Sequence, residues 1–211
     1  MYNPTIFREE KLDTLHRLMH EHPLGTLITH SSTGISANHI PFILHQDKSG
    51  NSVLRGHVAR SNPLWKTTRP DSEALIIFQG PQSYITPSWY PSKKEHGKVV
   101  PTWNYSVVHA HGTLQAIEDP NWLQAHLESL TTSQEKAQPS PWTINDAPVE
   151  YIHKMIKGIV GIVGIEIGIA RLEGKLKLGQ NKNSADRRGV IAGLNSLDRT
   201  EESKLAEMTK P

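Results

Sequence analysis

Hydrophobic residues near the start of the chain change from a helical to a strand period. Between residues 9 and 20, apolar side chains recur every three or four positions, which predicts a helix with one buried face, ended by Pro23. Alternating apolar and polar positions then predict three strands, at residues 25–30, 36–44 and 53–58. The last two are expected to form a hairpin. Pro41 has no N–H, so its strand should lie at a sheet edge or contain a bulge.

The middle of the chain continues this mixture. The pair Asn62-Pro63 is typical of a capped helix start, so a helix is expected over residues 63–68. Residues 74–79 are apolar and too few for a helix, and they predict a buried strand. Prolines and aromatic residues mark 80–101 as a long loop, and period-two alternation over 100–116 predicts a long strand.

The last part of the chain predicts helices at 121–130 and 149–157. Strand periodicity resumes over 159–178, with a hairpin expected near Glu173 and Gly174. Ser184 is expected to cap a further helix, and residues 201–211 are expected to fray.

About six strands with hairpin connections and peripheral helices favour an antiparallel barrel of mainly β, α+β character over a doubly wound sheet. The length of 211 residues fits one domain over 1–211, with a helical extension from about residue 184. The sequence Gly-Ile-Val occurs twice in succession at 158–163. Because this repeat is odd, it reverses the faces of the following side chains, and it predicts a bulge.

Composition removes several classes of function. The chain contains no cysteine, which excludes disulfides, thiolate metal sites and cysteine nucleophiles. Its net charge of +2 and its 36% hydrophobic residues are ordinary globular values, and they do not predict a nucleic-acid binder. The start of the chain lacks the plan of a signal peptide, and no run approaches the length of a membrane helix. A cytoplasmic protein without membrane contact is expected.

The first candidate for chemistry is the stretch at residues 53–65. In a strand, Arg55 and His57 share the face opposite the apolar one, and both are potential cations. Arg60, Ser61 and Asn62 then lead into a predicted helix N-terminus, whose free N–H groups attract anions. The stretch therefore predicts a phosphate cradle, with the glycine at position 56 allowing close approach to the backbone. The alternative is that Ser61 and Asn62 only cap a helix and both arginines are solvated.

The second candidate is the stretch at residues 98–111, which offers indole, amide and phenol groups along one strand. Such groups could stack on a planar heteroaromatic ligand, but Trp103 and Tyr105 at period two are also typical of core or dimer packing. His109 and His111 share a face, but no third ligand has a convincing spacing, so no metal site is predicted. Catalytic residues are not identified, and Ser88 has no base nearby.

The third stretch, residues 171–199, is rich in basic side chains. The ordinary interpretation is that these side chains are solvated on the protein surface. The more specific alternative is that they bind a phosphate-rich partner. The candidate contacts to DNA are Lys175, Lys177, Arg187 and Arg188.

Several of these segments are familiar. GHVARSNPLW, SWYPSK with VVPTWNY, and RLEGKLKLGQNK with DRRGVI, together with the opening YNPTIFRE, resemble the PaiB-like family of FMN-binding negative transcriptional regulators. The resemblance implies a split β-barrel like that of pyridoxamine-phosphate oxidase, in a homodimer that binds FMN between its subunits. It implies FMN contacts from the following residues: Arg55, His57, Arg60, Ser61 and Asn62 around the phosphate and ribityl chain, Thr102, Trp103 and Asn104 near the ring, and Gln180, Asn181 and Lys182 at the same cleft.

Two features depart from the family pattern, Gly179, where serine is expected, and the doubled Gly-Ile-Val. The leading hypothesis is a dimeric FMN-binding transcriptional regulator. One rival is a flavin-dependent oxidoreductase acting on a small substrate. The other is a haem-binding or haem-degrading protein, with His39, His57, His109 or His111 as axial ligands.

Overall fold

The computed structural model describes residues 1–32, 34–47, 49–68, 72–157 and 161–210. The strands are β1 (Arg8–Glu9), β2 (Leu24–Ser31), β3 (Gly34–Pro41), β4 (Ile43–Gln46), β5 (Ser52–Ala59), β6 (Glu73–Ile85), β7 (Thr102–Ile117) and β8 (Ile162–Lys177). The α-helices are α1 (Leu12–Glu21), α2 (Leu64–Thr67), α3 (Ser92–His96), α4 (Pro120–Glu135), α5 (Val149–Lys157), α6 (Ser184–Asn195) and α7 (Thr200–Thr209). No helix among the described residues is both long and apolar enough to cross a membrane.

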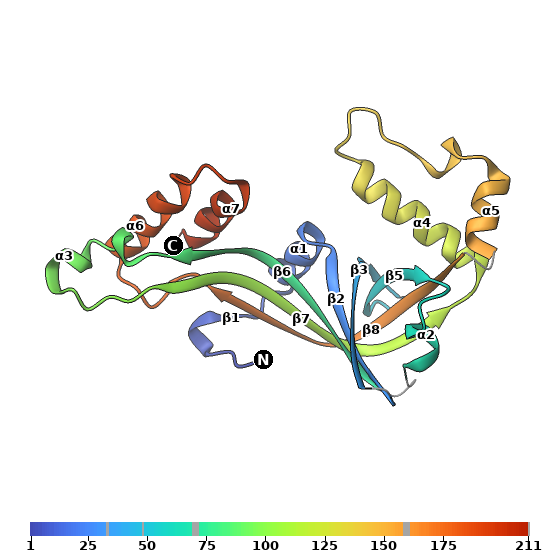
Figure 1. The fold of residues 1–211 in the computed structure, drawn as a ribbon, viewed down its shortest axis with the longest axis horizontal. Coiled ribbons are helices and arrows are strands. Elements are labelled where there is room, and N and C mark those ends of the chain that lie inside the picture. Colours follow the sequence, from blue (N-terminus) through green and yellow to red (C-terminus); the bar gives the residue numbers. More distant parts are fainter. Residues whose placement is uncertain (33, 48, 69–71, 158–160, 211) are drawn as a thin grey trace. The chain divides into compact units, whose positions relative to one another are not determined.

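The strands form one antiparallel sheet in the order β3-β2-β6-β7-β8-β5-β4, with β1 paired to β8 (Figure 1). Its two edges, β3 and β4, are not joined, so the sheet is an open, split barrel rather than a closed one. The predicted antiparallel β architecture is confirmed, with eight strands where about six were expected. The edge position of β3 agrees with the missing N–H of Pro41.

The chain divides into two compact units. Unit 1 consists of Met1–Glu21, Gln79–His109 and Glu173–Pro211, and unit 2 of His22–Phe78 and Ala110–Leu172. The core of unit 1 includes Ile85, Leu178, Val190 and Leu194. Strands β6, β7 and β8 each contribute residues to both units.

The predicted strand at 36–44 is in fact two strands. β3 pairs with β2 and β4 pairs with β5, and they are separated by Phe42, which is only 3% exposed. A Cβ at Gly56 would lie 2.8 Å from Ile40 and 3.1 Å from the Phe42 ring. The interpretation of Gly56 as an opening for a ligand is therefore wrong, because the chain's own core fills that space.

Two predicted interruptions of strands are absent. β8 runs without a turn through Gly174, where a Cβ would lie 2.2 Å from Leu15 and 2.8 Å from the Glu9 carbonyl oxygen. This glycine permits close packing against α1 and β1 rather than a hairpin. The predicted loop at 80–101 begins only after Ile85. Burial alternates along β6 up to Gly80, Gly80 and Pro81 are both buried, and the alternation then resumes in the opposite phase with Ser83 and Ile85.

The predicted helices are present with shifted ends. Asn183, not Ser184, caps α6, since its side-chain oxygen accepts a hydrogen bond from the Asp186 N–H at 2.8 Å. The segment expected to fray is helix α7, in which Leu205 and Ala206 are buried. The first copy of the doubled Gly-Ile-Val, residues 158–160, lies outside the described residues, so the bulge stays a prediction.

The segment after β6 is held by a notch on α6. A Cβ at Gly189 would lie 1.9 Å from the Trp89 carbonyl oxygen, and a Cβ at Gly193 would lie 2.2 Å from the Trp89 ring. Ser92 donates from its N–H and its hydroxyl to the buried carboxylate of Asp186. Two of the familiar motifs, SWYPSK and DRRGVI, are thus packing partners within unit 1 (α6 and α7 are red in Figure 1).

Gly189→Ala is expected to destabilise the protein by about 1–3 kcal/mol, because the new methyl group overlaps backbone that has no room to move. In an ordinary helix the same change stabilises by up to about 1 kcal/mol. Arg188→Ala, at an exposed position on the same helix, is the matched control, with an effect within about 0.5 kcal/mol. Urea unfolding measures both variants, and a stabilised Gly189→Ala would contradict the notch.

Candidate functional site

Within unit 2, strand β5 presents two different faces. Leu54 and Val58 are buried, 1% and 6% exposed, as the alternation predicts. Arg55 and His57 lie on the opposite face and are half-buried rather than solvated. That face therefore has to supply partners for a guanidinium and an imidazole.

Arg55 has two neighbours within unit 2. Its Nε donates to Glu166 Oε2 on β8 at 2.7 Å, and its guanidinium carbon lies 5.3 Å from the centre of the Trp122 ring on α4. The Trp122 ring occupies the space above Gly164, where a Cβ would be 2.3 Å from it. Arg55 is thus paired and covered.

His57 is paired with a second histidine on α4. Its Nδ1 lies 3.1 Å from Nε2 of His126, which is only 3% exposed, and the His126 ring stacks on Trp122 at 5.2 Å. One of these two nitrogens must donate and the other accept, so at least the accepting ring must be neutral. Nδ1 of His126 and Nε2 of His45 are buried and have no hydrogen-bond partner. We call Arg55, His57, Trp122, His126 and Glu166 the α4 anchor.

Burial keeps the imidazoles of this anchor neutral. Burial lowers the pKa of His57. Burial first, then the nearby His57, His45 and Arg55, lowers the pKa of His126 to about 3. The lowered pKa values favour the neutral form of both imidazoles at neutral pH, so His57, a potential cation in the sequence, lies here as an uncharged hydrogen-bonding group.

Arg60 follows β5 and has a different environment. Its Nη1 donates to Glu118 Oε2 at 2.5 Å and its Nη2 donates to the Ile162 carbonyl oxygen at 3.4 Å. Its Nε is buried without a partner. Trp65 donates its indole N–H to the Arg60 carbonyl oxygen at 3.1 Å, and this fixes the backbone of Arg60.

The predicted helix N-terminus beside Arg60 does not provide an anion site. Helix α2 has only four residues, and the side-chain oxygen of Asn62 accepts from the Leu64 N–H at 3.0 Å. Asn62 also donates to the Asn38 side chain at 2.8 Å. Capping is therefore the observed role of Asn62, whereas Ser61 is exposed.

At this corner it is Arg60, rather than the helix N-terminus, whose ionic partner can be exchanged. Glu118 is 54% exposed, and exposed ion pairs contribute only about 0–1 kcal/mol, so its contact with Arg60 is easily exchanged. Nε of Arg60 is buried without a partner, and Ser61 is exposed. Arg60 is therefore the predicted site residue of this stretch with an exchangeable ionic partner, while Arg55 and His57 have partners on β8 and α4.

The residues expected near the flavin ring lie in unit 1. Trp103 is 48% exposed, donates to Gln82 at 3.0 Å and meets the Tyr84 ring edge to face at 6.2 Å. Asn104 is buried on the other face of β7, and Thr102 accepts from Lys177 Nζ at 2.7 Å. Trp103 and Tyr84 therefore form an exposed aromatic surface, with polar groups behind it.

The turn after β8 brings three of the expected residues together in unit 1. Gly179 has φ of +79°, a left-handed conformation in which a serine would be strained. Gln180 closes this turn through the Leu178 N–H and the Leu176 carbonyl oxygen. Asn181 is exposed, and Lys182 Nζ lies 5.0 Å from the centre of the Tyr90 ring.

Most of the basic residues proposed for DNA contacts have partners inside the chain. Lys175 is 8% exposed and donates to the Tyr2 carbonyl oxygen at 2.9 Å. Lys177 donates to Thr102, and Arg187 Nη2 donates to the Thr209 carbonyl oxygen at 2.7 Å. Arg188 is exposed. The solvated basic face predicted from the sequence is thus largely absent at these positions.

The histidines considered as haem ligands also have neighbours. His39 Nδ1 lies 3.1 Å from the Thr26 hydroxyl, and His57 Nδ1 faces His126. His111 Nδ1 lies 3.7 Å from Glu73 Oε2.

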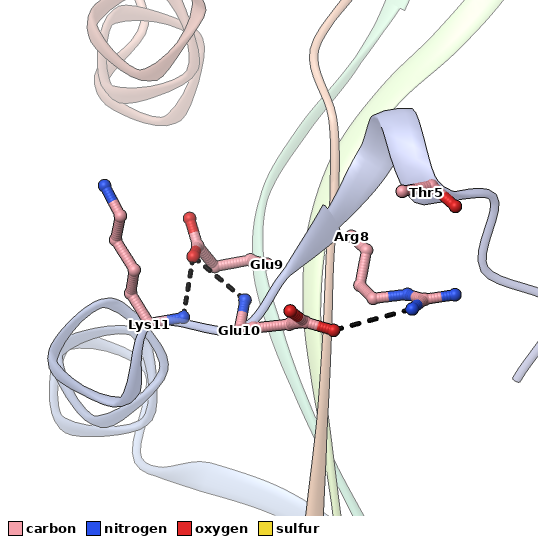
Figure 2. A pocket seen from close by; sticks show the side chains of 5 residues that line it. All are labelled: Thr5, Arg8, Glu9, Glu10 and Lys11. Atoms are coloured by element: carbon pink, nitrogen blue, oxygen red, sulfur yellow. Dashed lines mark hydrogen bonds and ion pairs between the residues drawn. The ribbon is translucent and has the colours of Figure 1, made fainter.

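A pocket of about 410 Å³ lies near the N-terminus, outside all the predicted site residues (Figure 2). Arg8 donates to Glu10 at 3.5 Å, and Glu9 accepts from the backbone N–H groups of Glu10 and Lys11 at 3.0 and 2.8 Å. Arg8 thus pairs with Glu10, Glu9 binds backbone N–H groups, and none of the predicted cofactor residues lines this pocket.

Four residues that contact the predicted arginines or His57 were missed by sequence reasoning: Glu118, Trp122, His126 and Glu166. The spacing of Trp122 and His126 by four residues put both on one face of a predicted helix, which was a usable signal. Glu118 carried no signal, because only tertiary structure places it beside Arg60.

Comparisons with known proteins agree on one family and one fold. Residues 1–171 match the model of the family described as "Putative FMN-binding domain". An uncharacterized protein of Emericella nidulans is 35% identical, over 93% of this chain and 91% of that one. The Protease synthase and sporulation protein PAI 2 of Bacillus subtilis is 29% identical, over 99% and 96% of the two chains.

The solved structure of the FAD and heme binding protein from Mycobacterium smegmatis superposes with a TM-score of 0.59. It is 15% identical in sequence, with 88% of this chain and 80% of that chain covered. At this identity the likeness concerns the fold alone.

Lowering the pH from 7 towards 4 is expected to lower the free energy of unfolding, because buried neutral histidines gain protons when the chain unfolds. Folded His57 and His126 have lowered pKa values, so the unfolded chain binds more protons below about pH 6.5. Each contributes a loss of up to about 1.4 kcal/mol per pH unit until its folded-state pKa is reached. Denaturant unfolding at several pH values measures the slope.

His126→Phe keeps a ring for Trp122 to stack on but removes one titrating group, so it should flatten this slope. His153→Gln, at an exposed position on α5, is the control and should leave the slope unchanged. An unaltered slope in His126→Phe would show that His126 is not a buried neutral group.

Proposed function

The chain is a split-barrel protein of the PaiB-like family of FMN-binding domains, and from this premise we propose that it binds FMN. The observation that carries the proposal is the environment of Arg60: a guanidinium with a buried, unpartnered Nε and an exchangeable carboxylate partner, within the residues that match the family. A dianionic phosphate monoester is the group that such an arginine suits best.

The proposed contacts divide between the two units. Arg60 and Ser61 hold the phosphate, while Arg55, His57 and Asn62 support this corner through α4, β8 and α2. Trp103 provides the stacking surface for the ring, with Thr102 and Asn104 beside it. The turn residues Gln180, Asn181 and Lys182 complete this side, although they follow the part of the chain that matches the family model.

We further propose that the chain works as a homodimer, with the phosphate contacts from one protomer and the ring contacts from its partner. The exposed pair Trp103 and Tyr84 supports this, since large exposed aromatic side chains are enriched at interfaces. Within each protomer the two units belong to one domain, because three strands contribute to both.

A role in regulation is the second candidate. It rests on the resemblance to the PaiB-like family, whose relative in Bacillus subtilis is named a protease synthase and sporulation protein. Direct DNA binding would depend on exposed Arg188, because the other three basic residues have internal partners. A flavin-dependent oxidoreductase and a haem protein are the remaining alternatives. Flavin-dependent consumption of a nicotinamide cofactor would favour the first, and a Soret band on addition of haem the second.

FMN added to the purified protein is expected to bind, and Arg60→Ala is expected to weaken its affinity at least about tenfold, because charged hydrogen bonds contribute about 1.5–3 kcal/mol. Flavin fluorescence quenching or calorimetry measures the dissociation constant. Arg8→Ala, at an exposed arginine paired with Glu10, is the matched control and should bind FMN normally. Wild-type protein that ignores FMN would refute the proposal.

For the regulatory role, a promoter fragment should be retarded at moderate salt and released as salt is raised. Arg188→Ala should weaken retardation, whereas Lys175→Met should affect stability rather than retardation, since Lys175 is buried. Equal retardation by wild type and Arg188→Ala would remove Arg188 from any DNA contact.

A further inference from the structure

We propose that the carboxylate of Glu118 occupies the position on Arg60 that the ligand's phosphate takes, and that Glu118 thereby sets the affinity and charge preference of this site. The inference rests on the proposed function, which supplies the phosphate, but it concerns a residue outside the predicted contacts. It assigns to Glu118 the role of a built-in competing anion.

The geometry makes Arg60 a fixed receptor. Its backbone N–H donates to the Gly161 carbonyl oxygen at 2.9 Å, and its carbonyl oxygen accepts from the Trp65 indole. Its guanidinium carbon lies 5.8 Å from the centre of the Trp65 ring, and Nη2 reaches the Ile162 carbonyl oxygen. With main chain, ring and Nη2 engaged, the guanidinium is held in place, and Nη1, which now pairs with Glu118, is the donor that an anion can take over.

The partner of Nη1 is the more exposed member of the pair. Glu118 lies in the connection between β7 and α4, and its side chain is 54% exposed, compared with 24% for Arg60. The next residue, Asp119, is committed to capping α4 by accepting from the Asn121 N–H at 3.0 Å. Glu118 can therefore rotate into water without disturbing the helix start, whereas Arg60 stays.

Carboxylate and phosphate oxygens compete for the same donors of a guanidinium. A bound phosphate must displace Glu118, and the displaced carboxylate still lies close enough to repel it. Neutral ligands, which do not use Arg60, experience neither effect. Glu118 should therefore lower the affinity for FMN and for inorganic phosphate, and leave the affinity for riboflavin unchanged.

The test compares the full-length wild type, Glu118→Gln, Arg60→Ala and the double variant. Calorimetry at low ionic strength measures the affinity for FMN, riboflavin and inorganic phosphate as three separate probes. Glu118→Gln should tighten phosphate and FMN about fivefold, the scale of one exposed charge interaction, with riboflavin unchanged. In the Arg60→Ala background the same substitution should have a smaller effect, because no competition for the guanidinium remains and only the direct repulsion between carboxylate and phosphate is removed. Glu128→Gln, at an exposed carboxylate on α4, is the control.

The outcomes separate this inference from flavin binding. If phosphate tightens in Glu118→Gln through Arg60 but FMN binds to none of the proteins, the competing anion stands and the FMN proposal falls. If FMN binds while Glu118→Gln changes neither FMN nor phosphate, the competing anion is refuted and flavin binding stands. Equal tightening of riboflavin, or no phosphate binding by any of the proteins, also overturns it.

Discussion

Much of unit 2 depends on one requirement: the polar side chains on the outer face of β5 need hydrogen-bonding partners. Arg55 and His57 are half-buried there, and burying a guanidinium or an imidazole without a partner costs free energy. Glu166 pairs with Arg55, and His126 pairs with His57. Trp122 covers both groups and sits on Gly164, which leaves room for its ring. Helix α4 is therefore held on the sheet by polar complementarity as well as by apolar packing. The same burial lowers the pKa of both imidazoles and so favours their neutral forms.

Glycines occur in this chain for two different reasons: some leave room for a close neighbour, and others adopt a positive φ. Gly56, Gly174 and Gly189 lie where a neighbouring side chain or backbone atom occupies the place of a Cβ. Gly179 instead has a positive φ that a turn requires. The sequence alone does not distinguish these two cases. Only the atoms that surround a glycine in space separate close packing from a turn, and for that reason the expected hairpin at Gly174 and the expected ligand approach at Gly56 were wrong.

The proposed flavin function depends mainly on one arginine. Arg55, His57 and Asn62 were grouped with Arg60 because they are adjacent in sequence, but the structure gives the first two to the α4 anchor and the third to capping α2. Arg60 alone combines a fixed guanidinium, an unpartnered nitrogen and an exchangeable carboxylate. Adjacent residues on a strand point to opposite faces, and residues beyond its end follow neither, so neighbours in sequence need not share a function.

The sequence by itself determined the family, the antiparallel β architecture and most helices, since these follow from local periodicity, capping residues and several motifs in a fixed order. It also determined that Leu54 and Val58 face the core. Tertiary structure alone decided which polar side chains can still bind a ligand. Lys175, Arg187 and His57 have no evident partner in the sequence. In the structure Lys175 bonds to Tyr2, Arg187 to Thr209 and His57 to His126, all from distant segments. The pKa values and the pairing of a charged side chain depend on what is brought beside it in three dimensions, and local patterns carry no record of that.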